Sequence, residues 1–582
     1  MQNIKTPGVY IQEISKLPAS VAPVATAIPA FVGYTEKRIR GKDIIPVNTP
    51  VKIASLLEYE EMFGLPYDEA YEITLSGSST SGDDTEIAVS PETSNLSPYL
   101  MYYHIRMYFA NGGGRCYVVS VGSYSSSPSS SSIDPDDLEK GIDALEAEDE
   151  PTILVVPETV VLSDSDRGSI YDHMLTQCAK LKDRFAIMDV EENDGPFDDA
   201  AAFRNITGMD NLSYGAAYYP SLNTTIRRFY EDKSVNIIDT RGDDDVGPFH
   251  GLNLMDLSEG SKYARGEIVI LSNDDISVGD IFKVGEDEFE VVDDNPEENQ
   301  FIKGSSERGT AQNLAIEIGE RDTYKAEKIS DKPVVLISAT EPGEDGEAID
   351  FSFSGSEAGA SLSGSGTLEI VDPDTSLYNK IKDTLDKKRL KLYPSGAISG
   401  VYARVDRDRG VWKAPANVGL NLVSTPSVKL SDDEQAPLNV HADTGKSINV
   451  IRNFHGKGTL VWGARTLAGN DNEWRYIPVR RLFIFIEESI KKATEPVVFE
   501  PNDANTWAKT RAMIENFLTG LWRNGALAGA TTEDAFFVKV GLGQTMSAID
   551  ILEGRLIIEI GIAAVRPAEF IILQFMHKLQ ES

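Results

Sequence analysis

The chain has 582 residues, of which 41% are hydrophobic, so it is long enough for more than one domain and for a core of good size. Its 92 acidic residues outnumber the 55 basic ones, and the formal net charge of −37 argues against nucleic acid and anionic membranes as partners. The two cysteines, Cys116 and Cys178, are too few for a disulfide framework and suit a reducing compartment during synthesis.

The sequence shows no signal for passage into or through a membrane. Residues 1–9 lack the charged start and apolar run of a secretory signal peptide, and no stretch of about 18 apolar residues could span a bilayer. We therefore expect no direct membrane insertion and no export by the Sec route.

The first 29 residues predict an extended arm. Thr6–Ile14 alternates like a strand and is entered through Pro7 and Gly8, while Leu17–Pro29 is rich in Pro, Ala and Val without a helical period. A frayed terminus is the alternative, because chain ends are often poorly ordered. The β-branched content of the segment favours the arm.

Residues 30–230 alternate between strand-like and helix-like segments, which is typical of an α/β layer. The expected strands are Ala30–Gly33, Arg115–Val121, Ile153–Val156, Arg184–Val190 and Ala216–Tyr219. The expected helices are Leu56–Phe63, Tyr99–Phe109, Leu138–Leu145 and Tyr171–Leu181. The Ser-, Thr- and Asp-rich stretch Gly77–Leu96 predicts a surface loop. The glycines Gly112–Gly114 lie between a helix and a strand, the reverse of the order in a phosphate-binding loop.

Helical periodicity almost vanishes between Glu231 and Pro373. Short apolar runs alternate there with acidic and Gly/Ser-rich turns, which predicts one or two small β-domains inserted into the core. The expected strands are Glu267–Leu271, Ile281–Val284, Phe289–Val292, Leu314–Ile318, Pro333–Ile337, Ile349–Phe353 and Thr367–Val371. We interpret the tripeptide Arg241–Asp243 as a chance surface turn and not an integrin motif, because three residues carry little information. The aspartates at Asp243–Asp245 and Asp293–Asp294 are interpreted as solvated turns, because they lack the spacing of calcium ligands.

The α/β core is expected to resume after the insertion with a basic helix at Leu377–Leu392. The alternating charges that follow predict a structural ion-pair network, within or between subunits, formed by Arg404, Asp406, Arg407 and Arg409. A catalytic carboxylate with basic partners is the alternative, but no nucleophile or histidine lies close in sequence. The segment Asp443–Ser447 contains the end of a Walker A motif, yet Val440 stands where the leading glycine is required.

Two amphipathic helices are predicted in the C-terminal region. The apolar stripe of the first consists of Leu482, Phe485, Ile486, Ile490 and Ala493, and Pro496 lies just past its end. The second follows the N-cap candidates Asn502–Asn505, and its stripe consists of Trp507, Ile514, Phe517, Leu518 and Leu521. Strand-like runs follow at Phe536–Val540, Leu556–Ile562 and Phe570–Phe575. A hydrophobic strand at a free terminus is either tucked into its own sheet or lent to the sheet edge of another molecule.

Several long motifs follow one another in the chain: Thr6–Ile14, Ala110–Val119, Pro394–Asn417, Ile448–Leu467, the two amphipathic helices and Arg566–Phe575. In their sequence and order these motifs resemble the sheath proteins of contractile tails, a family that covers phage tail sheaths, R-type pyocins and extracellular contractile injection systems. The resemblance covers both ends of the chain, and Glu231–Pro373 has no counterpart in it.

The resemblance implies an α/β (α+β) sheath core with mixed sheets and helices, inserted small β-domains, and extended N- and C-terminal arms. The expected domains are the N-terminal arm 1–29, the core 30–230 with its return segment 374–447, the insertion 231–373, the C-terminal domain 448–565 and the C-terminal linking strand 566–582. The family function is to polymerise helically, with six-fold symmetry, around an inner tube and to contract, which drives the tube through a target envelope.

In the family, both terminal arms add strands to a neighbour's C-terminal sheet. The resemblance assigns this role here to Val9, Tyr10, Ile11, Phe570, Ile571, Ile572 and Leu573. The C-terminal domain lines the tube, so basic residues of this region are candidates for contact with acidic groups on it. These are Lys491, Lys492, Lys509, Arg511 and Arg523, with Arg480 and Arg481 in the same region.

Besides further copies and the inner tube, the implied partners are baseplate and tail-terminator or cap proteins, without nucleic acid. The implied place of assembly is the bacterial cytoplasm, followed by release of the particle, a virion tail or an injection system, by lysis. The long insertion favours an extracellular injection system over a phage tail.

No catalytic constellation assembles in the sequence, and the six histidines show no metal-ligand spacing. We therefore predict no enzymatic activity, no catalytic, metal or cofactor-binding residues and no cofactor. Two alternatives stay open. One is a hydrolase or NTPase with the insertion as its substrate domain, and the other is a non-contractile surface-array protein.

Overall fold

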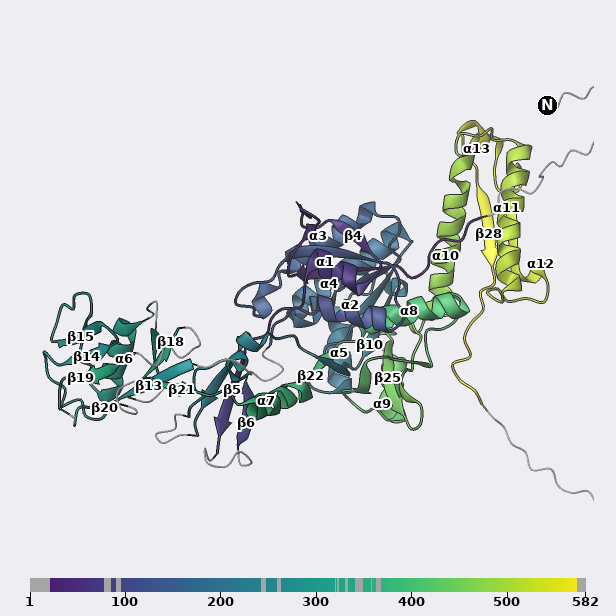
Figure 1. Ribbon diagram of the computed structural model, residues 1–582. Helices are drawn as coiled ribbons and strands as arrows, with labels where there is room; N and C mark the ends of the chain where they lie inside the picture. Colours follow the sequence, from purple (N-terminus) through teal and green to yellow (C-terminus); the bar gives the residue numbers. More distant parts are fainter. Residues whose placement is uncertain are drawn as a thin grey trace, which may run out of the picture. The chain divides into compact units, whose positions relative to one another are not determined.

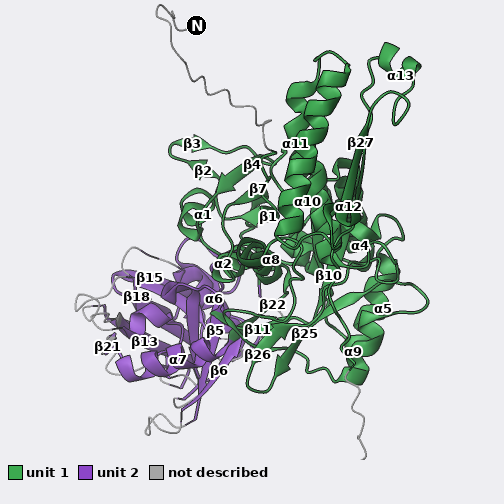
Figure 2. Ribbon diagram, turned by 90° about the vertical axis from the view of Figure 1, so that its right-hand side faces the viewer, with its two compact units in different colours: residues 1–67, 97–226, 389–582 green, residues 68–96, 227–388 purple. Residues whose placement is uncertain are grey.

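The computed structural model describes residues 21–77, 85–90, 96–241, 247–258, 263–319, 321, 324–329, 333–340, 349–356, 358–362 and 368–572. The chain divides into two compact units (Figure 2). Unit 1 comprises residues 1–67, 97–226 and 389–582, and unit 2 comprises residues 68–96 and 227–388. Helices and mixed sheets occur in both units, so the α/β (α+β) fold class predicted from the sequence is confirmed.

A nine-stranded sheet forms the centre of unit 1 (Figure 1). Its strands, in spatial order, are β23 (Val418–Gly419), β26 (Gly458–Val461), β25 (Ile448–Phe454), β10 (Gly215–Tyr219), β9 (Phe185–Asp189), β8 (Ile153–Val155), β1 (Pro29–Thr35), β7 (Cys116–Ser123) and β4 (Pro50–Ile53). The strands from β25 to β7 run parallel, and β26 and β4 pair antiparallel at the two sides. Parallel strands need cover on both faces, which explains their continuous apolar runs.

Helices cover both faces of this sheet. One face packs against α1 (Leu56–Phe63), α2 (Met101–Ala110) and α8 (Ser395–Arg409). The other face packs against α3 (Pro135–Asp143), α4 (Asp164–Leu181), α5 (Pro196–Ile206) and α9 (Asp432–Asn439). Along β1, Phe31 points to the first group and Ala30 and Val32 to the second, as the period of two in a strand requires. The helices and strands predicted between residues 30 and 230 are confirmed with small shifts at their ends, except that α4 begins at Asp164, about two turns before the predicted Tyr171.

Two smaller β-structures complete the core of unit 1. One is a three-stranded sheet of β22 (Arg389–Leu392), β11 (Leu222–Arg227) and β24 (Val423–Pro426), and the other is the hairpin of β2 (Ile39–Arg40) and β3 (Asp43–Ile44). The prediction of one helix over Leu377–Leu392 is therefore wrong at its end. Helix α7 (Thr375–Lys387) stops at Lys387, and Arg389–Leu392 alternates between exposed and buried residues as a strand does.

The C-terminal subdomain, defined here as residues 477–565, is built on the two predicted amphipathic helices. It comprises α10 (Ile477–Thr494), α11 (Ala504–Arg523), α12 (Thr532–Ala535), β27 (Phe536–Val540), α13 (Ala548–Leu552) and β28 (Ile558–Ile562). The carboxylate of Asp503 caps α11 by accepting from the backbone N–H groups of Asn505 and Thr506. The apolar stripes of both helices and one face of the β27–β28 hairpin share a core.

Unit 2 contains a small sheet of β5 (Tyr71–Ser76), β6 (Glu86–Ser90) and β12 (Val235–Asp239), which packs with α7 around its own core. The prediction of a surface loop over Gly77–Leu96 is wrong at Glu86–Ser90. Ile87 and Val89 alternate with exposed residues and pack toward this core, so the segment pairs with β5 despite its polar surroundings.

A nested module, defined here as residues 263–371, forms the rest of unit 2 around a separate apolar cluster. It contains α6 (Glu307–Ile318) and two sheets, with strands β13 (Tyr263–Ile270), β14 (Ile281–Val284), β15 (Asp287–Val292), β16 (Gln300–Ile302), β17 (Tyr324–Lys328), β18 (Val334–Ala339), β19 (Phe351–Phe353), β20 (Ala360–Leu362) and β21 (Glu369–Val371). The strand predicted at Leu314–Ile318 is wrong. Ser306 caps a helix there, and Ala311, Leu314 and Ile318 recur at helical spacing on the core.

Candidate assembly site

The β27–β28 hairpin forms a two-stranded antiparallel sheet in which Val538 faces Ile560 and Val540 faces Ile558. One face of it packs on the cores of α10 and α11, while Phe537, Lys539 and Glu559 are exposed on the other. Among the described residues neither outer edge of this hairpin pairs with a further strand. A two-stranded sheet is marginal by itself, and its unpaired backbone groups are a template for another strand.

Past Ile562 the chain stays bound to residues 526–528, with a bridge between Ala564 and Leu527 and a hydrogen bond from the Ala528 N–H to the Ala563 carbonyl at 2.7 Å, and it is fixed again at Glu569. The Glu569 carboxylate accepts hydrogen bonds from Arg465 Nη2 at 2.6 Å, from Asn439 Nδ2 at 2.8 Å and from the Tyr476 hydroxyl at 3.1 Å. Burial alone would raise the pKa of Glu569, but the hydrogen bonds from Arg465 and Asn439 hold it below its ordinary value. Glu569 is therefore a charged anchor at neutral pH.

Directly after this anchor, Phe570, Ile571 and Ile572 expose most of their side chains and belong to no strand. Three consecutive large apolar residues in water are unfavourable, because each forgoes about 1.5–3 kcal/mol of burial. Of the predicted linking residues, Leu573 and the N-terminal Val9, Tyr10 and Ile11 lie outside the described residues.

The described base of the N-terminal arm runs along the C-terminal subdomain. Val21 is buried in the core of α10 and α11, and the Val24 N–H donates to Ser489 Oγ at 3.2 Å. The Thr26 carbonyl accepts from Arg481 Nη2 at 2.7 Å. The described base of the N-terminal arm thus lies on the C-terminal subdomain, whereas Glu569 is held by residues outside that subdomain.

Arg481 forms a buried ion pair that joins α10 to α8. Its guanidinium donates to both oxygens of Asp406, at 2.9 and 2.6 Å, and stacks on the ring of Tyr402. Both charged side chains are almost fully buried. Sequence reasoning noted Asp406 but missed its partner, because the two residues are 75 positions apart.

The other members of the predicted ion-pair network do not gather around Asp406. Arg404 donates to the Gly419 carbonyl at 2.6 Å, and Arg407 pairs with its neighbour Asp408 at 3.0 Å on the surface. Arg409 is exposed at the end of α8.

Some of the basic residues predicted to face the tube are buried, and others are exposed. Arg480 and Arg481 are buried, and Arg480 stacks on Tyr214 and Trp474, so neither can form an outer basic surface. Lys491 and Lys492 both pair with Glu488, at 3.2 and 3.4 Å. The remaining three are exposed on α11: Lys509, Arg511 and Arg523. Of these, Arg511 pairs with Glu515 at 2.7 Å.

The carboxyl ends of the parallel strands, where open α/β sheets bind ligands, hold buried carboxyl groups. Glu158, after β8, accepts from the backbone N–H groups of Leu100 and Met101 at the start of α2. Asp189, which ends β9, accepts from the Ser395 N–H at the start of α8 at 2.8 Å. Burial raises the pKa of Glu158 to about 8 and that of Asp189 to about 7. Side chains of the chain itself thus occupy the helix N-termini that would attract a phosphate.

The Walker-like lysine has a structural position. The Lys446 ammonium is buried and donates to the backbone carbonyls of Arg204 and Thr207, at the C-terminal end of α5. Carbonyls at a helix C-terminus favour a cation, which explains a buried lysine at this point.

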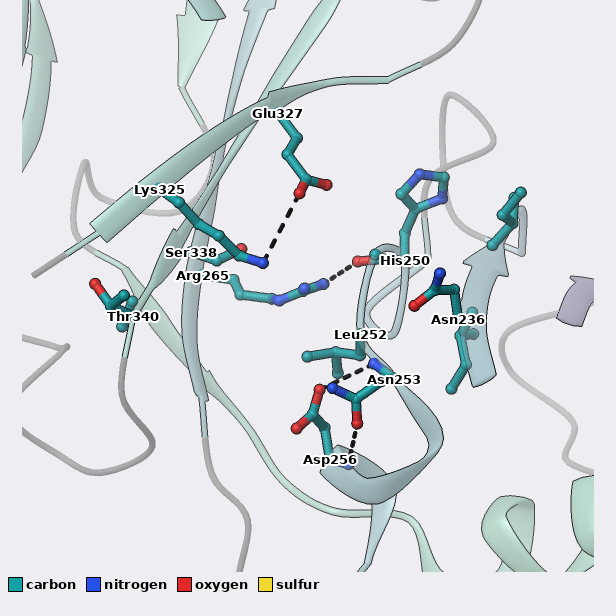
Figure 3. Close-up of a pocket in the computed structure, with 14 residues that line it drawn as sticks. Asn236, His250, Leu252, Asn253, Asp256, Arg265, Lys325, Glu327, Ser338 and Thr340 are labelled. Carbon is teal, nitrogen blue, oxygen red and sulfur yellow. Dashed lines mark hydrogen bonds and ion pairs between the residues drawn. The ribbon is translucent and has the colours of Figure 1, made fainter. Parts of the chain in front are cut away.

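A polar cavity of about 480 Å³ lies in unit 2 (Figure 3). Its charged groups are engaged with one another or with the backbone: Lys325 with Glu327 at 3.8 Å, Asp256 with the Asn253 N–H at 2.9 Å, and Arg265 with the His250 carbonyl. The His250 ring lies 3.2 Å from the Asp239 carbonyl, and burial lowers the pKa of His250. These pairings do not place a nucleophile beside a base.

In the part of the chain that the structure describes, no three His, Cys, Asp or Glu side chains gather as metal ligands. Within the same ranges, no helix has the length and apolar character needed to cross a bilayer.

Comparison with known proteins gives consistent matches. Residues 469–577 match the family model described as the phage tail sheath C-terminal domain. The tail sheath protein of Burkholderia phage BcepMu is 31% identical over 156 residues, which are 26% of this chain and 32% of the relative. That of Vibrio phage KVP40 is 26% identical over 162 residues, 28% of this chain and 23% of the relative. The chain thus matches about a third or less of the length of these curated relatives.

Two solved structures are similar over nearly the full length. The helical sheath of the anti-feeding prophage in its contracted state is 27% identical, with a TM-score of 0.52, over 99% of this chain and 100% of that chain. The contracted sheath complex of PVC, an extracellular contractile injection system, is 25% identical, with a TM-score of 0.51, over 99% of both chains.

Proposed function

We propose, from its confirmed resemblance to contractile tail sheath proteins, that this chain is a structural subunit that polymerises helically around an inner tube and contracts. The similarity to full-length sheaths of the anti-feeding prophage and PVC favours an extracellular injection system over a phage tail. In this proposal the particle is assembled in the bacterial cytoplasm and released by lysis.

The observation that carries the proposal is that the chain has both a sheet edge without a partner strand and an exposed apolar segment near its C-terminus. Among the described residues, the β27–β28 hairpin has unpaired edges and the apolar segment Phe570–Ile572 pairs with no strand. A strand lent from one copy to the hairpin of the next would satisfy both. The N-terminal segment Thr6–Ile14 is proposed to do the same.

A lent strand suits an assembly that changes shape. Sheath subunits must slide and rotate without separating, whereas packed side-chain surfaces have discrete arrangements and lose their contacts when moved. A backbone ladder stays intact while the connector outside it bends. Here residues 566–568, which precede the Glu569 anchor, are proposed as the connector to the strand that begins at Phe570.

No nucleotide is required in this proposal. The free energy of contraction would be stored in a metastable extended lattice and released through the larger buried interfaces of the contracted one. The occupied helix N-termini at Glu158 and Asp189 support a structural rather than a catalytic role for the core.

The exposed cations of α11 are proposed to meet acidic groups on the inner tube. Lys509, Arg511 and Arg523 remain on the surface of the C-terminal subdomain, the part that lines the tube in the family. An arrangement with six-fold symmetry, a baseplate and a cap protein belongs to the same proposal. Reversing Lys509 and Arg511 to Glu should release the tube but leave empty sheaths, whereas reversing the exposed Lys457 should leave the tube bound.

Negative-stain electron microscopy of the expressed full chain tests the function directly. The expected result is a population of regular striated cylinders. Monomers, or flat two-dimensional arrays, at concentrations where the folded chain is soluble would contradict a contractile sheath and favour one of the alternatives.

A further inference from the structure

A small basic hairpin projects from unit 1 of this acidic chain. The basic hairpin, defined as residues 36–47 around β2 and β3, carries four cations within six positions: Lys37, Arg38, Arg40 and Lys42. None of these four forms an ion pair with a carboxylate that the structure describes. Arg38 donates instead to the Ile45 carbonyl at 3.2 Å, and the nearby Glu36 carboxylate accepts from the Leu65 N–H at 2.7 Å. Arg40 and Lys42 are exposed, as is Asp43, the register partner of Arg40.

The same hairpin exposes large apolar side chains. Ile39 and Ile44 are register partners across β2 and β3, and Ile44 is 77% exposed. Val47 lies beside them in sequence, and Leu57 of the adjoining helix α1 is 74% exposed. Apolar residues that are exposed singly need no explanation, but a group of them rimmed by charges marks an interaction surface.

A second exposed apolar group lies at the end of the C-terminal subdomain. The acidic tip, defined as the connectors 495–503 and 541–557, joins α10 to α11 and β27 to β28. A hydrogen bond from Asn502 Nδ2 to the Arg555 carbonyl, at 3.0 Å, holds the two connectors together. The exposed apolar residues of the acidic tip are Val498, Phe499, Leu542, Ile549 and Leu552.

Phe499 is presented at an energetic cost. Its side chain is fully exposed, and its backbone lies at φ 69°, in the left-handed region. For a bulky side chain this conformation costs about 1–3 kcal/mol, and such strain is retained mostly where it has a function. The connector therefore holds an exposed aromatic ring at the acidic tip.

The charge of the acidic tip is opposite to that of the basic hairpin. Glu495 and Glu500 are exposed and form no ion pair with any residue that the structure describes, and the capping carboxylate of Asp503 lies beside them. The cation of this region, Arg555, is neutralised by Asp550 at 3.0 Å and by Glu553. The acidic tip thus offers carboxylates next to apolar side chains, as the basic hairpin offers cations next to apolar side chains.

We propose that the basic hairpin of one copy docks on the acidic tip of a second copy. Like-charged copies of a chain with a net charge of −37 repel each other, so their contacts require local attraction. The two patches lie at separate places on unit 1 (Figure 2), so a contact that uses each patch with a different neighbour is heterologous. A heterologous contact repeats from copy to copy and builds a ring or a helix.

This inference rests on the proposed self-assembly and adds a side-chain contact distinct from the lent strands. The contact between the basic hairpin and the acidic tip can form in one state of a lattice and break in another, because neither patch is needed for the fold of its own copy. It also predicts that raised salt weakens the contact, since exposed charges are screened beyond about 8 Å at physiological ionic strength.

A charge-swap experiment with the full chain tests the docking. Arg40→Glu with Lys42→Glu should lower cylinder yield at least ten-fold in negative-stain images, and Glu495→Lys with Glu500→Lys should do the same. The four changes together should restore assembly, because the attraction is re-formed with reversed sign. Lys457→Glu with Lys429→Glu, at two other exposed cations, is the matched control and should assemble normally. Thermal melting by circular dichroism verifies that every variant is folded.

Cysteine cross-linking tests the position of the contact. Lys42→Cys with Glu500→Cys should give ladders of covalent multimers under oxidation, whereas Lys457→Cys with Glu500→Cys should not; the native Cys116 and Cys178 are buried. Unchanged cylinders from the hairpin variant, or no rescue by the four-fold variant, would overturn the docking and leave the proposed function standing. Loss of the inner tube alone in the Glu495/Glu500 variant would reassign the acidic tip to the tube and also overturn it. A wild-type chain that never forms cylinders would instead refute the proposed function.

Discussion

Buried ionisable residues bind the helices of the core to its sheet. Glu158 and Asp189 cap the N-termini of α2 and α8, and Arg481 ties α10 to α8 through Asp406. An unpaired charge in an apolar interior costs several kcal/mol, so each of these groups either binds a proton or requires its partner. The consequences for stability differ between the two cases.

The stability of unit 1 should fall as the pH rises through the range in which Glu158 titrates. The pKa of Glu158 is raised from 4.5 to about 8 by burial, so between these values the folded chain keeps a proton that the unfolded chain has lost. The contribution of Glu158 to stability is therefore full below about pH 4.5, declines toward pH 8 and levels off above it. Glu158→Gln removes this dependence while keeping an oxygen acceptor for Leu100 and Met101. We expect its melting temperature to gain a few degrees on the wild type between pH 5 and 9.

The exposed Glu61 of α1 provides the control, since Glu61→Gln should leave the difference between pH 5 and 9 as in the wild type. The difference in melting temperature between the wild type and Glu158→Gln should therefore change between pH 5 and 9. A difference that stays constant over this range would show that the carboxyl of Glu158 is already charged or hydrated.

Replacing Arg481 with Met should destabilise unit 1 by about 3–5 kcal/mol, because Asp406 is then buried without its cation. The Thr26 carbonyl loses its donor as well. Adding Asp406→Leu should recover most of this loss, since two apolar residues replace the pair. Urea denaturation followed by tryptophan fluorescence measures both variants. A double variant as unstable as Arg481→Met would mean that lost packing, not the orphaned charge, dominates.

The elements that matter most for assembly are those left incomplete within one chain. The β27–β28 hairpin has the period-two pattern of a stable sheet but only two strands, and the apolar segment after Glu569 has no strand to join among the described residues. Each would be completed by a second copy, so the pairing is a property of the assembly.

Ile572→Pro should abolish cylinder formation, because proline cannot donate a hydrogen bond to a strand ladder. Ile572→Ala is the matched variant, since it trims the side chain but keeps the N–H, and it should weaken assembly only partly. Negative-stain images score the polymer. The side chain is exposed in one chain, so melting temperatures of both variants should equal that of the wild type within about 1 °C. Intact, contracting cylinders from the proline variant would exclude a lent strand at this position.

At the scale of the whole molecule, the nested module 263–371 is a separate body with its own apolar core. The boundaries expected from the sequence, 231 and 373, would also remove β12, which pairs with β5 and covers Ile73 and Leu75. Tyr263 and Val371 face each other across β13 and β21, so the module can be excised where its two ends meet.

Replacing residues 263–371 with a short Gly/Ser linker should leave the chain soluble and able to form cylinders, if the module is a decoration that does not hold the lattice. Removal of Glu231–Pro373 provides the contrast, because it exposes β5 and should cause aggregation. Electron microscopy and sedimentation velocity score both variants. A folded, monodisperse 263–371 deletion that never polymerises would assign the module to a subunit contact.

Local sequence determined the elements whose pattern is complete within a short window. The stripes of α10 and α11, the strands β27 and β28 and the alternation of strands and helices in the core follow from periods of 3.6 and 2. Long motifs such as Ile448–Leu467 identified the resemblance to tail sheaths because they preserve many positions at once. Two predictions from local composition are wrong. The strand Glu86–Ser90 was predicted as a loop because its neighbours are polar, and the helical segment Leu314–Ile318 was predicted as a strand from its short apolar run.

Tertiary structure alone decided which charges are buried and which remain on the surface. From the sequence, Arg480 and Arg481 were grouped with Lys491 and Lys492 as candidate surface cations, but in the structure they stack on aromatic rings within the core. The partners of Arg481 and Glu569 lie 75 and more positions away in sequence, so no local pattern could reveal them. The free energy of a charged side chain depends on the groups that surround it after folding, and those groups are assembled from the whole chain.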